Sequence, residues 1–314
     1  MSEFVVLFAV GLLLLAVGST ALVLGAARLD RATGRSAFAV GLVAVGFGPC
    51  VAGLAFDLAA VLHKLPRLAM GNVIGGNIAS IGLVLGAAVL VRPITGTAKL
   101  FATAIPLVIV AALLFWFLAR DNKVERIEAG VLLVAGLGAL ALLIHKARQE
   151  SEPVKAEFAA WVPNRLSMWT AGGLVLAGLG ALIGGAVLVT TNANETVRRL
   201  SLDSHRLGLV SAGVMALPAL VAAVCAARRG RSNLVLGLAV GPALFNLLLV
   251  VGTVAMVRPL LVIEGAILNE VPAMALFTLL LVTPLANGLR VSRGEGAILL
   301  VACAGFVAWQ VTKK

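Results

Sequence analysis

The side chains that could bind an ion or a proton are few, and they lie inside long apolar runs. One of them is an acid, Asp57, and four are amides or hydroxyls: Asn72, Asn77, Ser80 and Asn246. Polar and ionisable side chains are costly inside a bilayer, so those that occur there usually mark a substrate or ion pathway. These five residues are the first candidates for function, provided that the runs around them cross a membrane.

The composition places most of the chain in lipid. Of the 314 residues, 61% are hydrophobic and only 12% are charged, and the mean hydropathy is +1.08. A soluble domain of this size could not cover so much apolar surface. About ten runs reach the roughly 20 apolar residues that a spanning helix needs. We therefore expect a multi-pass integral protein of the plasma or inner membrane, with the lipid bilayer as its main partner.

The remaining composition excludes several other classes of protein. The net charge of +11 lies mainly in loops, which suits anionic lipid headgroups as neighbours and requires no nucleic acid. Three cysteines, Cys50, Cys225 and Cys303, lie in apolar runs and predict neither a disulfide framework nor a metal site. The spans contain no paired acids, HExxH motif or Ser/His grouping, so neither an enzyme nor a cofactor is expected.

One stretch of the sequence occurs twice. Residues 71–93, GNVIGGNIASIGLVLGAAVLVRP, align without a gap on residues 237–259, GLAVGPALFNLLLVVGTVAMVRP, at an offset of 166. The glycine spacing and the Val-Arg-Pro ending recur, and an apolar sequence does not readily repeat these by chance. Internal self-similarity is the signature of a repeated structural unit.

The expected spans divide into two halves. They lie near 4–27, 36–62, 66–91, 99–119, 126–146, 170–193, 206–228, 232–257, 266–287 and 295–311. The polar segment 147–168, either a surface amphipathic segment or a plain linker, separates a first five-helix repeat, 1–146, from a second, 169–314. The repeated stretch returns five spans later, and five is odd, so the second copy crosses the membrane in the opposite sense. Such inverted repeats are common in secondary transporters.

The orientation of the chain follows from its loop charges. Lys and Arg are somewhat more numerous in the loops on the side of the 147–168 segment. Positive charge accumulates on the cytoplasmic side of membrane proteins. This bias favours a cytoplasmic 147–168 segment and external termini.

The motifs resemble those of a known family of transporters. Pro49 and Pro218 interrupt an apolar run in each half, and each is followed by the repeated stretch, which begins GNVIGGNI in the first half. This arrangement resembles the cation/calcium antiporter superfamily, the sodium/calcium exchangers, over nearly the whole chain. The resemblance implies an all-α membrane protein of ten spans in two inverted five-helix repeats. It also implies ion sites at helix breaks, here at Pro49, Gly75, Gly76, Pro218, Gly241 and Pro242.

The expected ion ligands depart from that family. Where the family carries a Pro-Glu pair in each half, Cys50 follows the first proline and Ala219 follows the second. The resemblance leaves backbone carbonyls at the breaks and the side-chain oxygens of Asn72, Asn77, Ser80 and Asn246. Ca²⁺ takes about six to eight oxygen ligands, usually with carboxylates among them. The set is therefore a poor calcium site, and it suits a monovalent cation, a proton or a small polar solute.

Asp57 is the acid best placed near this expected site. It follows Cys50 by seven residues, close to two helical turns, and so lies on the same helix face roughly 10 Å further along. It is either a relocated ion or proton ligand on the pathway or an acid in a wet vestibule beside Lys64 or Arg67.

The other polar residues stand at span ends and have plainer interpretations. The cluster from Thr190 to Glu195 is expected to end a span facing water, and Glu264 and Glu270 to lie at the membrane interface. The three histidines lack metal-ligand spacing and are His63, His145 and His205.

Three interpretations of function follow. The first is a secondary transporter of exchanger type that works by alternating access with altered ion chemistry. The second is a non-transporting membrane scaffold that retains the exchanger fold. The third is an unaltered sodium/calcium exchanger, which the missing glutamates oppose. Polar residues at Asn72 and Asn77 favour transport, whereas Leu238, Pro242 and Ala243 at the matching part of the second half favour the scaffold.

Overall fold

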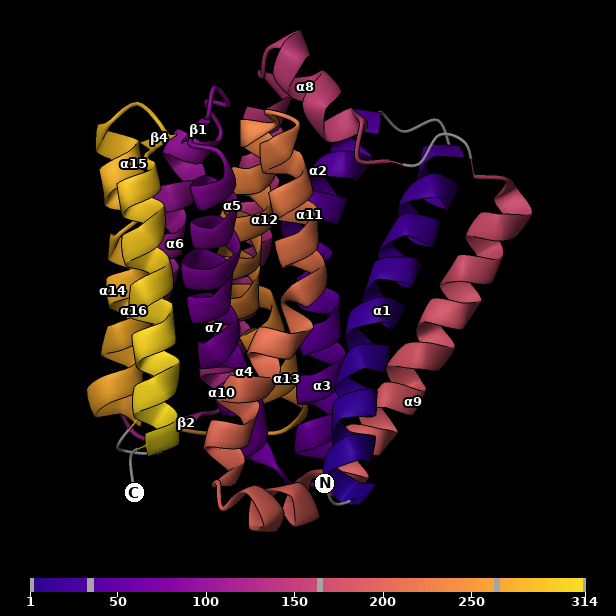
Figure 1. The fold of residues 1–314 in the computed structure, drawn as a ribbon, viewed down its shortest axis with the longest axis vertical. Coiled ribbons are helices and arrows are strands. Elements are labelled where there is room, and N and C mark those ends of the chain that lie inside the picture. The colour runs from indigo at the N-terminus through magenta and orange to yellow at the C-terminus, as the bar shows by residue number, and fades with distance from the viewer. Residues whose placement is uncertain (1–2, 33–36, 163–165, 263–265, 313–314) are drawn as a thin grey trace.

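The molecule is a bundle of long helices that run between two ends (Figure 1). The computed structural model describes residues 3–32, 37–162, 166–262 and 266–312. Helix α1 begins and α16 ends at one end of the bundle, and α8 lies across the other. The elements are α1 (Glu3–Ala32), α2 (Ala37–Phe47), α3 (Cys50–Leu62), α4 (Pro66–Ile78), η1 (Ala79–Leu85), α5 (Gly86–Val91), β1 (Ile94–Thr95), α6 (Phe101–Leu118), β2 (Lys123–Val124), α7 (Arg126–Arg148), α8 (Glu152–Ala159), α9 (Met168–Leu200), α10 (Ser204–Met215), α11 (Leu217–Arg228), α12 (Ser232–Phe245), η2 (Asn246–Val250), α13 (Val251–Val257), β3 (Leu260–Leu261), η3 (Ala266–Glu270), α14 (Val271–Leu279), α15 (Val282–Ala286), β4 (Arg290–Val291) and α16 (Arg293–Thr312).

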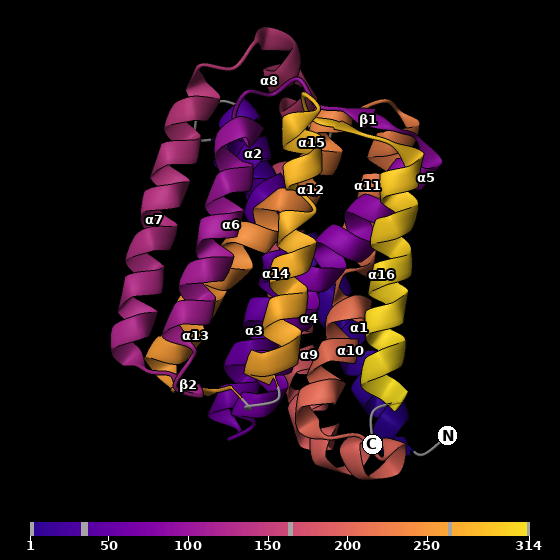
Figure 2. The same cartoon turned by 90° about the vertical axis from the view of Figure 1, so that its left-hand side faces the viewer.

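Seven helical stretches in the described residues are long and apolar enough to cross a membrane, and the bent pair α2–α3 makes an eighth. The most buried are Pro66–Val91 and Ser232–Val257, whose apolar windows are 78% and 89% buried. These two stretches hold the repeated sequence, so they form the centre of the bundle. The spans expected at 266–287 and 295–311 correspond to the short helices η3, α14 and α15 and to the 20-residue α16. On one face, α7 and α16 flank α6 and α14 (Figure 2).

Helices α1 and α9 lie side by side and run in opposite directions (Figure 1). Their contact uses small residues: a Cβ built on Gly11 would lie 2.9 Å from the Gly185 carbonyl, and one on Gly25 would lie 2.7 Å from the Ala171 carbonyl. Close backbone approach through small residues is the usual way in which helices associate in lipid.

The recurring glycines of the repeated stretch make equivalent contacts in the two halves. Gly71 and Gly75 of α4 pack on α10, and Gly237 and Gly241 of α12 pack on α2. A Cβ on Gly241 would lie 2.4 Å from Gly46 Cα. Side chains at these positions would push the central helices away from the first part of each interrupted span.

The Val-Arg-Pro endings of the repeated stretch also make cross-contacts. The Arg258 Nη1 atom donates to the carbonyl of Val61, at the C-terminal end of α3, at 3.2 Å. Arg92 lies against Gly230, just beyond the end of α11. A cation near a helix C-terminus is favoured by the helix dipole. The following strands pair in the same crossed manner, β1 with β4 and β3 with β2.

The helix interruptions differ in kind between the spans. Between α2 and α3 the chain bends by 47° at Gly48 and Pro49, and Pro218 is the second residue of α11, which follows a turn at Ala216. By contrast, the helix runs without interruption through Gly75 and Gly76 and through Gly241 and Pro242, where breaks were expected. The departure from α geometry comes three to four residues later, as the π-helical segments η1 and η2.

The segment 147–168 is more than a plain linker, because it holds α8, which is packed on the bundle. Phe158 is fully buried, and a Cβ on Gly41 of α2 would lie 2.1 Å from its carbonyl. The Glu157 carboxylate accepts from Leu234 N at 2.9 Å and from Asn233 Nδ2 at 2.7 Å. It therefore caps the N-terminus of α12, where a negative charge is favourable.

Candidate functional site

The two interrupted spans meet at a small cavity, here termed the central cavity. Its volume is about 50 Å³, more than the roughly 10–15 Å³ that one water occupies. Eight of the residues predicted from the sequence line it: Pro49, Cys50, Asn72, Gly76, Ser80, Ala219, Pro242 and Asn246. Asp57, Asn77, Gly75, Pro218 and Gly241 were predicted as well but do not line it. The structure therefore brings most of the predicted set to one place.

Asp57 is fully buried on α3 and reaches the central cavity through Asn72. Its Oδ1 atom accepts a hydrogen bond of 2.9 Å from Asn72 Nδ2. Its Oδ2 atom is buried and has no hydrogen-bond partner among the described residues. The wet-vestibule alternative does not agree with this position, because Asp57 is enclosed whereas the side chains of Lys64 and Arg67 are exposed.

The backbone carbonyl of Val73 joins the two copies of the repeated stretch. Asn77 Nδ2 donates to it at 3.1 Å and Asn246 Nδ2 at 2.9 Å. The Asn246 bond ties the start of η2 to α4. Asn77 is fully buried, and its Oδ1 atom has no partner in the described part of the chain. An amide oxygen in this state could accept from a ligand or coordinate a cation.

The remaining polar atoms at the central cavity are bonded to backbone. Ser80 Oγ donates to the Gly76 carbonyl at 2.7 Å, and Cys50 Sγ donates to the Pro242 carbonyl at 3.7 Å. Ala219 contributes only a methyl group. No carboxylate lines this cavity among the described residues, so its wall offers neutral dipoles and no countercharge for a divalent cation.

A larger cavity of about 330 Å³ adjoins the central cavity and shares Pro49, Met215 and Ala219 with it. It extends toward the α8 end, where Trp161, Arg229 and Arg231 line it. We term it the outer cavity. It lies between the central cavity and the end of the bundle that carries α8.

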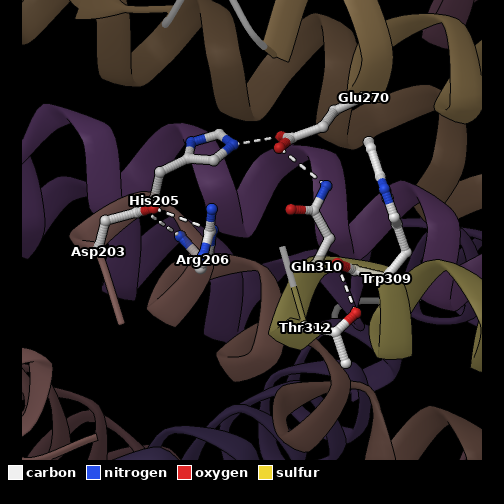
Figure 3. A network of polar contacts seen from close by, with 7 residues as sticks. All are labelled: Asp203, His205, Arg206, Glu270, Trp309, Gln310 and Thr312. Atoms are coloured by element: carbon white, nitrogen blue, oxygen red, sulfur yellow. Dashed lines mark hydrogen bonds and ion pairs between the residues drawn. The ribbon is translucent and has the colours of Figure 1, made fainter. Parts of the chain in front are cut away.

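A second buried polar cluster is drawn in Figure 3 and lies at the end of the bundle where α10 begins and α16 ends (Figure 1). Glu270 is buried between His205 and Gln310, with one carboxylate oxygen in contact with His205 Nε2 and the other accepting from Gln310 Nε2 at 2.9 Å. Glu270 is only 4% exposed, so its side chain lies inside the bundle. The cluster was missed because its members are far apart in sequence. The sequence did contain one sign of it: His205, Glu270 and Gln310 are each a polar residue near the end of an apolar run.

The other predicted polar positions are less informative. Thr190 and Asn192 are buried and bond to carbonyls of their own helix, and Glu195 pairs with Arg198 and Arg199. The Thr191 and Asn194 side chains of this cluster are exposed, and α9 continues past it to Leu200. Glu264 lies outside the described residues. No group of three or more His, Cys, Asp or Glu suited to a metal occurs in the described ranges.

Comparisons with known proteins agree with this architecture. The chain is 27% identical to the putative antiporter CaxA of Alkalimonas amylolytica, with 95% of each chain covered. It is 27% identical to the inner membrane protein YrbG of Escherichia coli, covering 96% of this chain and 94% of that protein. It is 26% identical to the sodium/calcium exchanger MaX1 of Methanosarcina acetivorans, covering 87% and 89%.

The fold and the family agree with these relatives. The structure is similar to that of the sodium-calcium exchanger NCX_Mj, with a TM-score of 0.68 and 23% identity over 98% of this chain and 99% of that one. The family pattern described as sodium/calcium exchanger protein matches residues 3–144 and 170–312. The chain, a multi-pass membrane protein, therefore belongs to the sodium/calcium exchanger family.

Proposed function

We propose that this protein is a secondary transporter of the inner membrane that exchanges a monovalent cation for protons, with Asp57 as the acid that binds them. Family membership supports cation transport across a membrane and gives no support to an enzymatic role. One relative is named a putative antiporter, which supports movement of the two ions in opposite directions. Another is named an inner membrane protein, which supports the location.

The proposal includes ten spans in two inverted five-helix repeats, 1–146 and 169–314, joined by 147–168. It is supported by element bounds that recur at the offset of 166, as in α4 with α12 and η1 with η2. The antiparallel contact of α1 with α9 and the crossed strand pairs have the same symmetry. Inverted repeats place a substrate site between the two halves, which is where the central cavity lies.

The observation that carries the proposal is the Asp57–Asn72 pair. A carboxyl group that is fully buried in a membrane span is expensive and is usually functional. The Asn72 amide holds Oδ1, and the unpartnered Oδ2 is free to take a proton or contact a cation. Proton loading and cation loading on one oxygen exclude each other, and such competition is what an exchanger requires.

The central cavity argues against calcium as the exchanged ion. A dication in a low-dielectric site needs countercharge, and the two positions where the family has glutamates are Cys50 and Ala219. One buried carboxyl group can balance one positive charge. The site therefore suits a monovalent cation or a proton.

The test is ion-driven proton flux in proteoliposomes that contain a pH-sensitive dye. Addition of Na⁺ or K⁺ outside should alkalinise the lumen of vesicles with the wild-type protein, because protons leave as the cation enters, and Ca²⁺ should not. Asp57→Asn should reduce this flux to the protein-free background, because Asn retains the bond from Asn72 but cannot bind the proton. Glu152→Gln is the matched control, since the Glu152 side chain is 86% exposed on α8, and it should leave flux unchanged.

Two outcomes would contradict the proposal. Full flux in folded Asp57→Asn would remove Asp57 from the mechanism. No flux of any cation in the wild-type protein would favour the membrane scaffold, the interpretation that the apolar residues around Asn246 support.

A further inference from the structure

We propose that His205, Glu270 and Gln310 form a proton-binding site that is separate from the central cavity, in which the His205 ring takes up and releases one proton. The three side chains come from α10, η3 and α16 and point toward one another (Figure 3). They are 1%, 4% and 2% exposed. Their contacts join three elements that no short connection links.

The hydrogen bonds indicate which ring nitrogen of His205 is open to a proton. Both carboxylate oxygens of Glu270 are occupied, one by His205 Nε2 and one by Gln310 Nε2. Nε2 therefore carries the hydrogen of a neutral His205 ring. His205 Nδ1 is buried and has no hydrogen-bond partner among the described residues, and the same is true of Gln310 Oε1. A proton from water that binds the Nδ1 lone pair converts the ring to imidazolium and leaves the cluster with no net charge.

Packing alone does not account for these side chains. The residues 166 positions earlier are Ala39, Ala104 and Ile144, on α2, α6 and α7, which correspond to α10, η3–α14 and α16. At the corresponding positions the first half therefore has apolar residues. Burying an ionisable pair in place of apolar side chains of similar volume brings no general gain in stability, so its presence in one half indicates a function.

The charged groups around the pair are few. On α10, Asp203 and Arg206 pair with each other at 3.1 Å, and the Asp203 carboxylate also accepts from Arg206 N as the helix cap. Helix α4, whose Gly71 packs on the His205 carbonyl, carries the exposed Arg67, and α3 carries Asp57, bonded to Asn72. Helix α16 contributes the neutral Gln310, and Glu3 of α1 is exposed. On α9, Glu195 pairs with Arg198 and Arg199. Glu270 is therefore the charged partner that faces the ring.

The cluster lies close to the exposed start of α10. His205 is the second residue of α10, and the Asp203 side chain, which caps that helix, is 52% exposed. Loading a proton turns a neutral-to-charged contact into an imidazolium–carboxylate contact, and such charge-assisted hydrogen bonds are about twice as strong as neutral ones. The loaded site would hold the first part of the interrupted span α10–α11 more firmly against η3 and α16.

The test is nitrogen NMR of the histidine ring in the full-length protein in lipid nanodiscs. The chain has three histidines, so His63→Gln with His145→Gln leaves His205 as the single labelled ring. The Nδ1 resonance should change from the bare to the protonated form as the sample is acidified over the pH range in which the protein stays folded. In the same background, Glu270→Gln should abolish this change in that range, and Glu195→Gln should not affect it.

Three results would overturn the proposal. The first is a ring that stays in one protonation state across the range in the parent protein. The second is a ring whose titration is the same in Glu270→Gln, and the third is one whose titration disappears equally in Glu195→Gln. The first result is measured in the parent protein, whose cluster is unchanged. It therefore stays decisive even if the Glu270→Gln variant misfolds. The readout does not involve transport, so it is independent of the proposed exchange activity.

Discussion

Asp57 and Cys50 illustrate, at the scale of single residues, how the site differs from the pattern that its family resemblance implies. The acids expected beside the two helix breaks are absent, and Cys50 instead bonds to a backbone carbonyl. An acid is present one turn beyond Gly53 on the same helix, and its partner is Asn72 of the repeated stretch. The resemblance implies two acids at the breaks, whereas the structure places one buried carboxyl group further along α3.

Calcium binding is the first prediction at this scale. The purified protein should not bind Ca²⁺ at micromolar levels in isothermal calorimetry, because a single carboxyl group and neutral dipoles do not offset the desolvation of a dication. Cys50→Glu combined with Ala219→Glu should raise the affinity. Micromolar heats in the wild-type protein that vanish in Asn77→Ala would contradict this prediction.

The sequence predicted much of the central cavity but not the second cluster. Cys50, Asn72, Ser80 and Asn246 could be grouped because a repeated motif and a family resemblance place them at equivalent breaks. His205 and Glu270 belong to no motif, and they meet only because α10 and η3 pack together. A pattern along the chain does not contain that contact.

At the scale of elements, the repeated glycines and the Val-Arg-Pro endings act between the halves. Gly241 allows α12 to approach Gly46 of α2, and Arg258 bonds to the end of α3. The glycine spacing was visible in the sequence, whereas its partners were not. The π segments η1 and η2 were not predicted, because a π bulge inserts into a helix without a proline or other marker at its start.

Glycine substitution tests this packing. Gly241→Ala should lower the free energy of unfolding by about 1–3 kcal/mol, the usual cost of overpacking, because its Cβ would lie 2.4 Å from Gly46 Cα. Gly138→Ala on α7 is the control: a Cβ there meets nothing within 4 Å, so the helix should gain up to about 1 kcal/mol. Thermal unfolding in one detergent measures both. Equal midpoints for the two variants would show that the close contact does not limit stability.

At the scale of the whole molecule, the two halves pack on each other through equivalent contacts. The repeated stretch of one half packs on the interrupted span of the other, and the strands after it pair across the halves. The helix order and the central position of 71–93 and 237–259 could be predicted, because composition and an internal repeat specify them. The position of α8 on the bundle could not, since its sequence suits a linker equally well.

The proposed exchange requires the central cavity to open alternately to the two sides of the membrane. In the described structure, the outer cavity adjoins it on the side of the α8 end. Cys50 lines the central cavity, and the other two cysteines, Cys225 and Cys303, can be replaced by serine. A small membrane-impermeant thiol reagent should then label Cys50 from either face, in spheroplasts and in inside-out vesicles. Labelling from the α8 face alone, or from neither face, would contradict the account and leave a scaffold.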